Sequence, residues 1–274
     1  MNIIDLKTKG FVRIKYPSDL RRAVLKAQQA WVEFNLLPKE VRLSFSYSNS
    51  GAGVGYEEKD GSGPMGDFKR NFDVALSGKD WLYERVEKIQ NQVARVFVES
   101  ALEMVSVMTP FVLGFASEVE REFELKGFEE EISSGKDAFF VRFAFYPPQK
   151  EAGEVICQAH VDQSGATPHL FESAPGLECL TYDGKWIPMT VSEHETVIIP
   201  DMQMQLRSNG VLRALWHRVV ANTETARNGR YSAVTFLQFQ DTPKYDKSTH
   251  GRLQEKPEGF NYGMSQGEFA KLFK

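Results

Sequence analysis

His160-Val161-Asp162, together with His217 further along the chain, decides how residues 138–240 are interpreted. Successive side chains of a strand point to opposite faces, so His160 and Asp162 share one face. His217 has apolar residues two positions before and after it, as expected on a strand that faces a barrel interior. Two imidazoles and one carboxylate form a donor set that holds a non-haem Fe(II) and leaves coordination positions open. We therefore predict a metal site at His160, Asp162 and His217.

A His-x-Asp pattern alone also occurs on exposed polar strands, so the metal site depends on its agreement with the neighbouring motifs. The other histidines, His169, His194 and His250, have no partner at strand spacing and stand in polar or turn-like surroundings. We expect these three to be structural or solvated.

Arg230-Tyr231-Ser232 predicts an anion anchor. Alternation puts Arg230 and Ser232 on one face of a strand whose continuation, residues 233–237, has a buried pattern. A buried guanidinium is costly without a partner, and its planar fork binds a carboxylate through two hydrogen bonds. We therefore expect Arg230 and Ser232 to hold the carboxylate of a ligand.

The aromatic run at residues 139–146 is a further predicted strand, with Arg142, Ala144 and Tyr146 on one face. The hydroxyl of Tyr146 is a candidate donor to the same carboxylate as Arg230. Arg142 is a candidate for binding an anionic group of the substrate, and the alternative is a structural carboxylate as its partner.

Composition favours one large domain that acts on a small molecule. The chain has 274 residues, of which 42% are hydrophobic, enough for a sizeable core. A formal charge of −4 gives no basic field for nucleic acid or an anionic membrane. The two cysteines lack the paired spacing of zinc or redox motifs, and no run approaches 18 apolar residues. With no signal-peptide pattern at the start, we expect a cytoplasmic protein.

The pattern divides the chain into a mainly helical cap at residues 1–131, a β-rich core at 138–240 and a tail at 241–274. Helical periodicity predicts helices from residue 18 to about 36, from 81 to about 113 with a break at Pro110, and from 117 to about 126. The Gly-rich stretch 47–65 predicts a flexible loop. The tail is a candidate lid, with a short helix expected at residues 265–274.

Within the core, Asp183-Gly184 and Asn209-Gly210 predict hairpin turns, because both pairs tolerate the positive φ angles of those turns. Repeated hairpins favour a jelly roll. The predicted fold class is therefore α+β and β-rich, with a jelly-roll core and an N-terminal helical cap.

These motifs resemble the isopenicillin N synthase-like family of Fe(II)/2-oxoglutarate-dependent oxygenases. The segments that carry the resemblance are Val141-Arg142, Tyr146-Pro147-Pro148, His160-Val161-Asp162-Gln163-Ser164-Gly165, Pro175-Gly176-Leu177-Glu178, Gly184-Lys185-Trp186-Ile187-Pro188, Ser208-Asn209-Gly210, His217-Arg218-Val219-Val220 and Arg230-Tyr231-Ser232. The resemblance covers nearly the whole chain, and its specific motifs lie in the β-rich core.

The resemblance implies a distorted double-stranded β-helix with iron held by His160, Asp162 and His217. It also implies that 2-oxoglutarate chelates the iron and sends its distal carboxylate to Arg230 and Ser232, assisted by Tyr146. Many relatives have an Asn two residues before that Tyr, where this chain has Ala144, so one contact of the family is absent.

The implied activity is oxidation of an unactivated C–H bond in a small molecule by hydroxylation, desaturation or cyclisation, with 2-oxoglutarate converted to succinate and CO₂. Fe(II), 2-oxoglutarate and O₂ are the implied cofactor and co-substrates, with ascorbate as an additional reductant. An amino acid, a peptide or an intermediate of secondary metabolism is the expected kind of substrate. Two alternatives stay open: an Fe(II) oxidase or cyclase that does not use 2-oxoglutarate, and a non-catalytic jelly-roll binding module.

Overall fold

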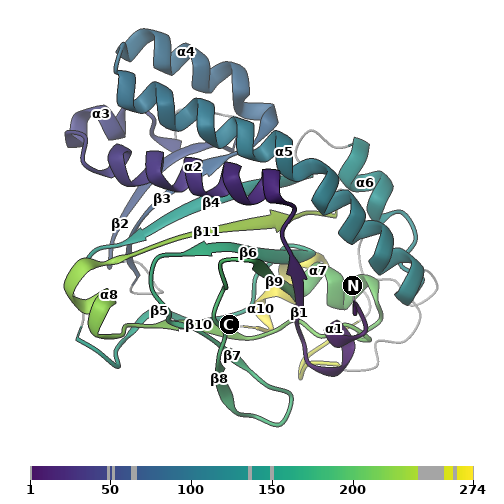
Figure 1. The fold of residues 1–274 in the computed structure, drawn as a ribbon. Coiled ribbons are helices and arrows are strands. Elements are labelled where there is room, and N and C mark those ends of the chain that lie inside the picture. The colour runs from purple at the N-terminus through teal and green to yellow at the C-terminus, as the bar shows by residue number, and fades with distance from the viewer. Residues whose placement is uncertain are drawn as a thin grey trace.

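Two antiparallel sheets form the centre of the fold in the computed structural model (Figure 1), which describes residues 2–47, 50, 53–62, 67–134, 138–148, 151–239, 256–261 and 264–273. The larger sheet has the order β1-β9-β6-β11-β4-β3-β2 and the smaller sheet the order β5-β10-β7-β8. The larger sheet consists of β1 (Val12–Lys15), β2 (Gly55–Asp60), β3 (Phe68–Val74), β4 (Phe139–Tyr146), β6 (Ala166–Glu172), β9 (Glu195–Pro200) and β11 (Arg230–Leu237). The smaller sheet consists of β5 (Val155–His160), β7 (Leu177–Leu180), β8 (Trp186–Pro188) and β10 (His217–Val220). This arrangement confirms the predicted β-rich jelly-roll core.

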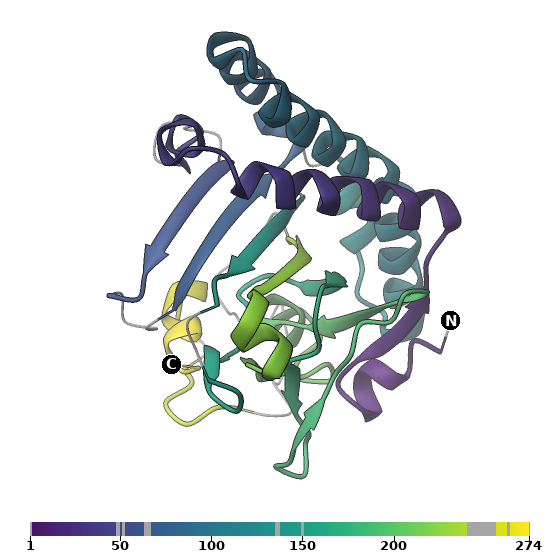
Figure 2. The same ribbon diagram turned by 60° about the vertical axis from the view of Figure 1, so that its left-hand side comes forward.

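Helices cover the outer face of the larger sheet, with α2 and the long α5 lying across it (Figures 1 and 2). The helices on this side of the molecule are α2 (Ser18–Asn35), α3 (Lys39–Leu43), α4 (Lys79–Ile89), α5 (Gln92–Phe123) and α6 (Phe128–Ser134). Shorter helices are α1 (Asp5–Thr8), η2 (Leu76–Gly78), α7 (Met202–Arg207) and α8 (Thr223–Asn228). Between helices and sheet lie stacked and edge-on aromatic rings. Trp31 of α2 lies 5.2 Å from Phe97 of α5, which lies 5.3 Å from Phe143 of β4. This aromatic layer supplies the hydrophobic packing on the outer face of the sheet. The polar side chains of the sheet can therefore lie on its inner face.

Among the described residues, α5 is the one helix long and apolar enough to cross a membrane by length and composition alone. Of its most apolar window, 56% is buried inside the protein. Its buried side chains include Val105, Met108 and Phe115, which belong to the main hydrophobic core. Partial burial of this kind is also the pattern of a core helix in a globular protein.

The helix predicted from residue 81 to about 113 is two helices. Gln90 has a left-handed backbone with φ of 53° and ends α4. The side chain of Asn91 then caps α5 by accepting a hydrogen bond from the backbone N–H of Ala94 at 3.0 Å. The apolar periodicity continues from α4 into α5, but the cap at Asn91 separates the two helices.

The predicted break at Pro110 and the predicted new helix at residue 117 are wrong, because α5 runs through both to Phe123. A proline inside a helix costs about 3 kcal/mol. Val112, Phe115 and Val119, all beyond the proline, are fully buried. Their burial offsets the cost of the proline, which local propensity alone does not reveal.

The flexible loop predicted at residues 47–65 contains a strand, so the prediction is wrong for residues 55–60. These residues form β2, which pairs with β3 in regular antiparallel register from Gly55 to Asp60. Gly55 has φ of +122°, and a Cβ there would lie 2.5 Å from the carbonyl oxygen of Phe45. The glycine thus permits close chain packing rather than a loose loop. Residues 48–49, 51–52 and 63–66 of this stretch lie outside the described residues.

The two predicted turns have different outcomes. Asp183-Gly184 joins β7 to β8 as a hairpin, with φ of +83° at Gly184. Asn209 and Gly210 have positive φ of 53° and 77°, as expected, but they follow α7 instead of joining two strands. The N–H of Gly210 donates to the carbonyl of Gln205 at 2.8 Å and closes the end of that helix.

The tail is described only from residue 256, apart from residues 262–263 and 274, so the predicted lid at 241–274 stays a prediction. The expected terminal helix is present as α10 (Gln266–Lys271), with a capping box formed by Ser265 and Glu268. Fully buried Phe269 belongs to a small cluster with Val161 and Met202. The end of the chain therefore packs behind the His160-Val161-Asp162 segment.

Candidate active site

The register of the larger sheet builds one polar inner face. Ala144 of β4 lies opposite Asn71 of β3 on one side and Ser232 of β11 on the other. Tyr146 in the same way lies opposite Arg230. Residues directly opposite each other in an antiparallel pair share a face. These side chains line a cavity between the two sheets.

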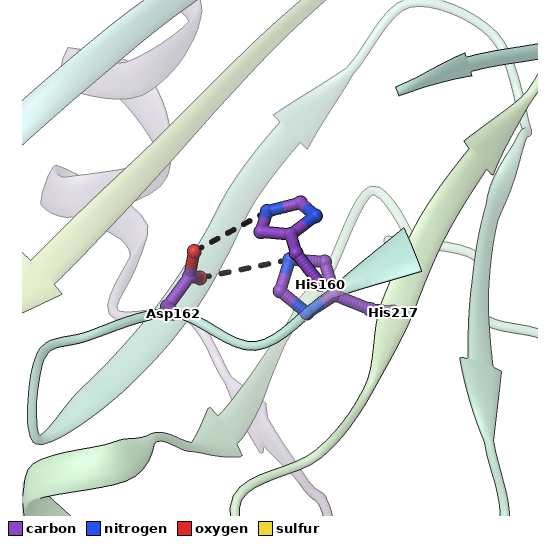
Figure 3. Close-up of side chains that lie close together, drawn as sticks. All are labelled: His160, Asp162 and His217. Carbon is purple, nitrogen blue, oxygen red and sulfur yellow. Dashed lines mark ion pairs between the residues drawn. The ribbon is translucent and has the colours of Figure 1, made fainter. Parts of the chain in front are cut away.

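The three predicted metal ligands enter this cavity from the smaller sheet and the loop that follows β5. His160 at the end of β5 pairs in register with His217 at the start of β10. The Nε2 atoms of His160 and His217 lie 3.5 Å and 3.6 Å from the two carboxylate oxygens of Asp162 (Figure 3). All three ligand atoms lie within 4.8 Å of one another. The structure therefore brings together the three residues that the sequence predicted.

Hydrogen bonds on the far side of each imidazole orient the two histidines. The Nδ1 atom of His160 lies 2.7 Å from the carbonyl oxygen of Gln158, and that of His217 lies 3.2 Å from the carbonyl of Leu215. An Nδ1–H that donates to a carbonyl leaves the lone pair of Nε2 directed at the shared centre. The donor set and its orientation fit Fe(II).

Electrostatics favours the ligand forms of His217 and Asp162. Burial lowers the pKa of His217 to about 4, so its imidazole is neutral at physiological pH. Burial alone would raise the pKa of Asp162, but the neighbouring His217 and His160 hold it well below its usual range. A neutral imidazole and an ionised carboxylate are the forms that bind a divalent cation.

A buried hydroxyl supports Asp162 from behind. Thr167 Oγ1 lies 2.9 Å from Asp162 Oδ2 and 2.8 Å from Asp201 Oδ2. The hydroxyl of Ser164 donates to the same oxygen of Asp201 at 2.5 Å. Burial, followed by the charge of Asp162, raises the pKa of Asp201. The hydroxyl of Thr167 is therefore placed to orient the metal ligand Asp162 without binding the metal itself.

The predicted anion anchor lies in the same cavity, and Arg230 already has a protein partner. Arg230 and Ser232 are both buried and line the cavity. Nη2 of Arg230 lies 2.6 Å from Oε2 of Glu172, and Nε donates to the carbonyl of Ala174 at 3.0 Å. The ion pair removes the cost of an isolated buried charge, and it was not expected from the sequence.

Tyr146 lies in the cavity next to Cys157, whose thiol donates to Asp67 Oδ2 at 3.9 Å. Burial raises the pKa of the Tyr146 hydroxyl and of the Cys157 thiol, so both are protonated. Lys69 on β3 lies with its Nζ 5.8 Å from the centre of the Tyr146 ring and 2.8 Å from Asp67 Oδ2. Tyr146 is thus placed opposite Arg230 in the sheet, with a protonated hydroxyl.

Arg142 lines the cavity and is held by a carboxylate. Its Nε and Nη2 each lie 2.7 Å from an oxygen of Asp73, a bidentate pair. This geometry is the structural alternative considered for Arg142. Nearby Asn71 is 1% exposed, and its Oδ1 has no hydrogen-bond partner among the described residues. An unsatisfied buried carbonyl oxygen marks a place where a ligand donor would bind.

His169 was missed by sequence reasoning. It lies on β6, is buried and lines the cavity, with its ring 5.9 Å from that of His217 and nearly perpendicular to it. Burial lowers its pKa to about 3, so the ring is neutral. Its Nε2 has no partner among the described residues. The available signal was alternation with Thr167, which puts both residues on the inner face. His169 is therefore a cavity residue rather than a solvated one.

Two facing antiparallel sheets that enclose a 2-His-1-carboxylate cluster and a buried arginine define a jelly-roll protein with a non-haem metal site. Residues 136–239 match the family model of the 2OG-Fe(II) oxygenase superfamily. The dioxygenases among the similar proteins agree with this match, which spans the β-rich core of the chain. The resemblance seen in the sequence is confirmed.

Similar proteins agree with this assignment. The chain is 37% identical over 95 residues to the protein Downy Mildew Resistance 6 of Arabidopsis thaliana, covering 34% of this chain and 27% of that protein. It is 26% identical over 158 residues to mugineic-acid 3-dioxygenase of Hordeum vulgare, covering 53% and 46%. The chain thus spans less than half the length of these curated relatives.

A solved structure shows the same fold. The complex of the dioxygenase for auxin oxidation 1 of Arabidopsis thaliana with 2-oxoglutarate superposes with a TM-score of 0.69 at 17% identity, covering 88% of this chain and 89% of that one. Fe(II), 2-oxoglutarate and O₂ are the cofactor and co-substrates of the superfamily. His160, Asp162 and His217 are the residues of this chain that would hold the iron.

Proposed function

We propose that this protein is an oxygenase that couples conversion of 2-oxoglutarate to succinate and CO₂ with hydroxylation of an unactivated C–H bond in a small molecule. One observation carries the proposal: the His160, Asp162 and His217 cluster and the anchor residues Arg230 and Ser232 face the same cavity. A metal and a carboxylate anchor in one enclosed space match the two ends of a 2-oxo dicarboxylate. Bound Fe(II) would supply the activation of O₂.

The residues of the chain contribute positioning. His160, Asp162 and His217 bind the metal, while Arg230 and Ser232 orient the distal carboxylate of 2-oxoglutarate. The rest of the cavity wall includes aromatic and aliphatic side chains, which limit access of water to the reacting centre. These lining side chains are Tyr146, Phe171, Leu177, Val191, Val219, Val234 and Phe236.

The substrate side of the cavity is formed by β3 and β4. Lys69 and Arg142 line it, and each is paired with a carboxylate, Asp67 and Asp73 respectively. These pairs offer hydrogen-bond donors without surplus positive charge, and Asn71 between them offers a free acceptor. We therefore infer a neutral or zwitterionic substrate, such as an amino acid, in preference to a net anion.

A library assay tests the proposed function. The protein is incubated in air with Fe(II), 2-oxoglutarate and ascorbate, and succinate is measured with neutral, zwitterionic and anionic small molecules. We expect stimulation by members of the first two sets and none in His217→Ala. Oxygen consumption that needs Fe(II) but not 2-oxoglutarate would instead support an oxidase or cyclase. Failure of the apo-protein to bind Fe(II) under anaerobic titration would support a binding module.

A further inference from the structure

Arg230, the residue expected to receive the distal carboxylate of 2-oxoglutarate, is already ion-paired with Glu172. The side chains of Arg230 and Glu172 are only 4% and 3% exposed. The other carboxylate oxygen of Glu172 accepts the backbone N–H of Val191 at 2.8 Å. Further hydrogen bonds to the backbone thus hold both members of the pair, so the fold itself fixes the position of the ion pair.

A β-bulge brings Glu172 to this position. Along β6, Thr167, His169 and Phe171 all line the cavity. The register between β11 and β6 shifts between Ala233 and Val234, so Glu172 lies opposite Ser232. The carboxylate of Glu172 contacts Arg230, while the backbone of Glu172 pairs with that of Ser232. A bulge next to a site that re-aims one side chain is a common structural device.

The ion pair leaves N–H groups of Arg230 available to a ligand but makes binding of an anionic ligand less favourable. Glu172 and the carbonyl of Ala174 use two of the five N–H groups of the guanidinium, so the others remain for a second carboxylate. That second carboxylate would meet a cation whose charge is already balanced, and it would lie close to the negative Glu172. Like charges near one another in a buried site repel with little screening.

We propose that Glu172 is a resident counter-ion that sets the affinity of the site for 2-oxoglutarate, keeping it weaker than an unpaired arginine would make it. This inference rests on the proposed function and concerns the same cavity. It predicts that turnover responds to the concentration of 2-oxoglutarate instead of saturating at low levels. Glu172 is thus a residue that acts on the ligand through Arg230.

The test is Glu172→Gln, which removes the charge and keeps the size. Anaerobic calorimetry on the Fe(II) protein measures binding of 2-oxoglutarate and of pyruvate, a 2-oxo acid without a distal carboxylate. We expect 2-oxoglutarate to bind about tenfold more tightly to the variant, while binding of pyruvate stays unchanged. Glu178→Gln is the matched control, because Glu178 pairs with Arg218 at 2.7 Å away from the cavity. That control should leave both affinities unchanged.

A purely structural role for Glu172 predicts the opposite sign, since a loosened guanidinium would bind 2-oxoglutarate less tightly. Unchanged or weaker binding of 2-oxoglutarate to Glu172→Gln therefore overturns the inference. If that variant does not fold, Glu172→Met repeats the removal of charge at similar length. Failure of the proposed function is distinct: the wild-type protein would then lack Fe(II) binding or substrate-dependent succinate formation, whatever the effect at residue 172.

Discussion

Replacement of Thr167 by valine should weaken binding of Fe(II) while leaving every metal ligand in place. Thr167 is fully buried, and its hydroxyl lies 2.9 Å from Asp162 and 2.8 Å from Asp201. Valine has nearly the same shape, so no cavity forms and the change removes only these hydrogen bonds. Loss of a group that orients a metal ligand typically weakens metal binding about 10–100-fold.

The same substitution should reduce the free energy of unfolding of the apo-protein by about 1–3 kcal/mol, the cost of leaving a buried polar group without a partner. Anaerobic titration of the apo-protein with Fe(II) measures the first effect, and urea denaturation measures the second. Thr235→Val is the matched control. Thr235 is a fully buried strand threonine whose hydroxyl lies 3.3 Å from the sulfur of Met108, away from the metal cluster.

The control should retain the Fe(II) affinity of the wild-type protein. If Thr167→Val is folded and binds Fe(II) as tightly as the wild type, to within about twofold, the orienting role of Thr167 is refuted. Equal losses of affinity in Thr167→Val and Thr235→Val would also contradict it, because both would then reflect general loosening of the sheets.

Three further results are expected. Fe(II) at one hundred times the dissociation constant of the wild-type protein should raise the free energy of unfolding by about 2.7 kcal/mol in anaerobic denaturation. An equal gain in His160→Ala at the same Fe(II) concentration would rule out the proposed cluster. Asn71→Leu should raise KM for the organic substrate about tenfold, because a buried acceptor is lost, with no effect on the Kd for 2-oxoglutarate; unchanged KM would place the substrate elsewhere. Trp31→Ala should lower the free energy of unfolding by about 3–5 kcal/mol, as measured in urea, whereas a loss below about 1 kcal/mol would show that the aromatic layer contributes little.

Much of the site could be predicted because its geometry is local. The period of two along a strand puts Arg230 with Ser232 on one face and separates Arg142 from its apolar neighbours. Neither inference needs contacts distant in sequence. The same locality explains the errors: the Gly-rich stretch that contains β2 and the proline within α5 have local patterns that disfavour the observed structure. Pairing with β3 and burial against the core outweigh those patterns.

The sequence by itself determined which residue types could bind a metal and an anion, and the local order in which they alternate. Only the tertiary structure decided their partners. Pairing of β5 with β10 brings His160 beside His217, and the bulge in β6 turns Glu172 toward Arg230. The physical reason is that strand register and bulges depend on backbone hydrogen bonds between segments distant in the chain. The periodicity within one strand therefore does not predict which charged residue of a neighbouring strand will lie beside a given side chain.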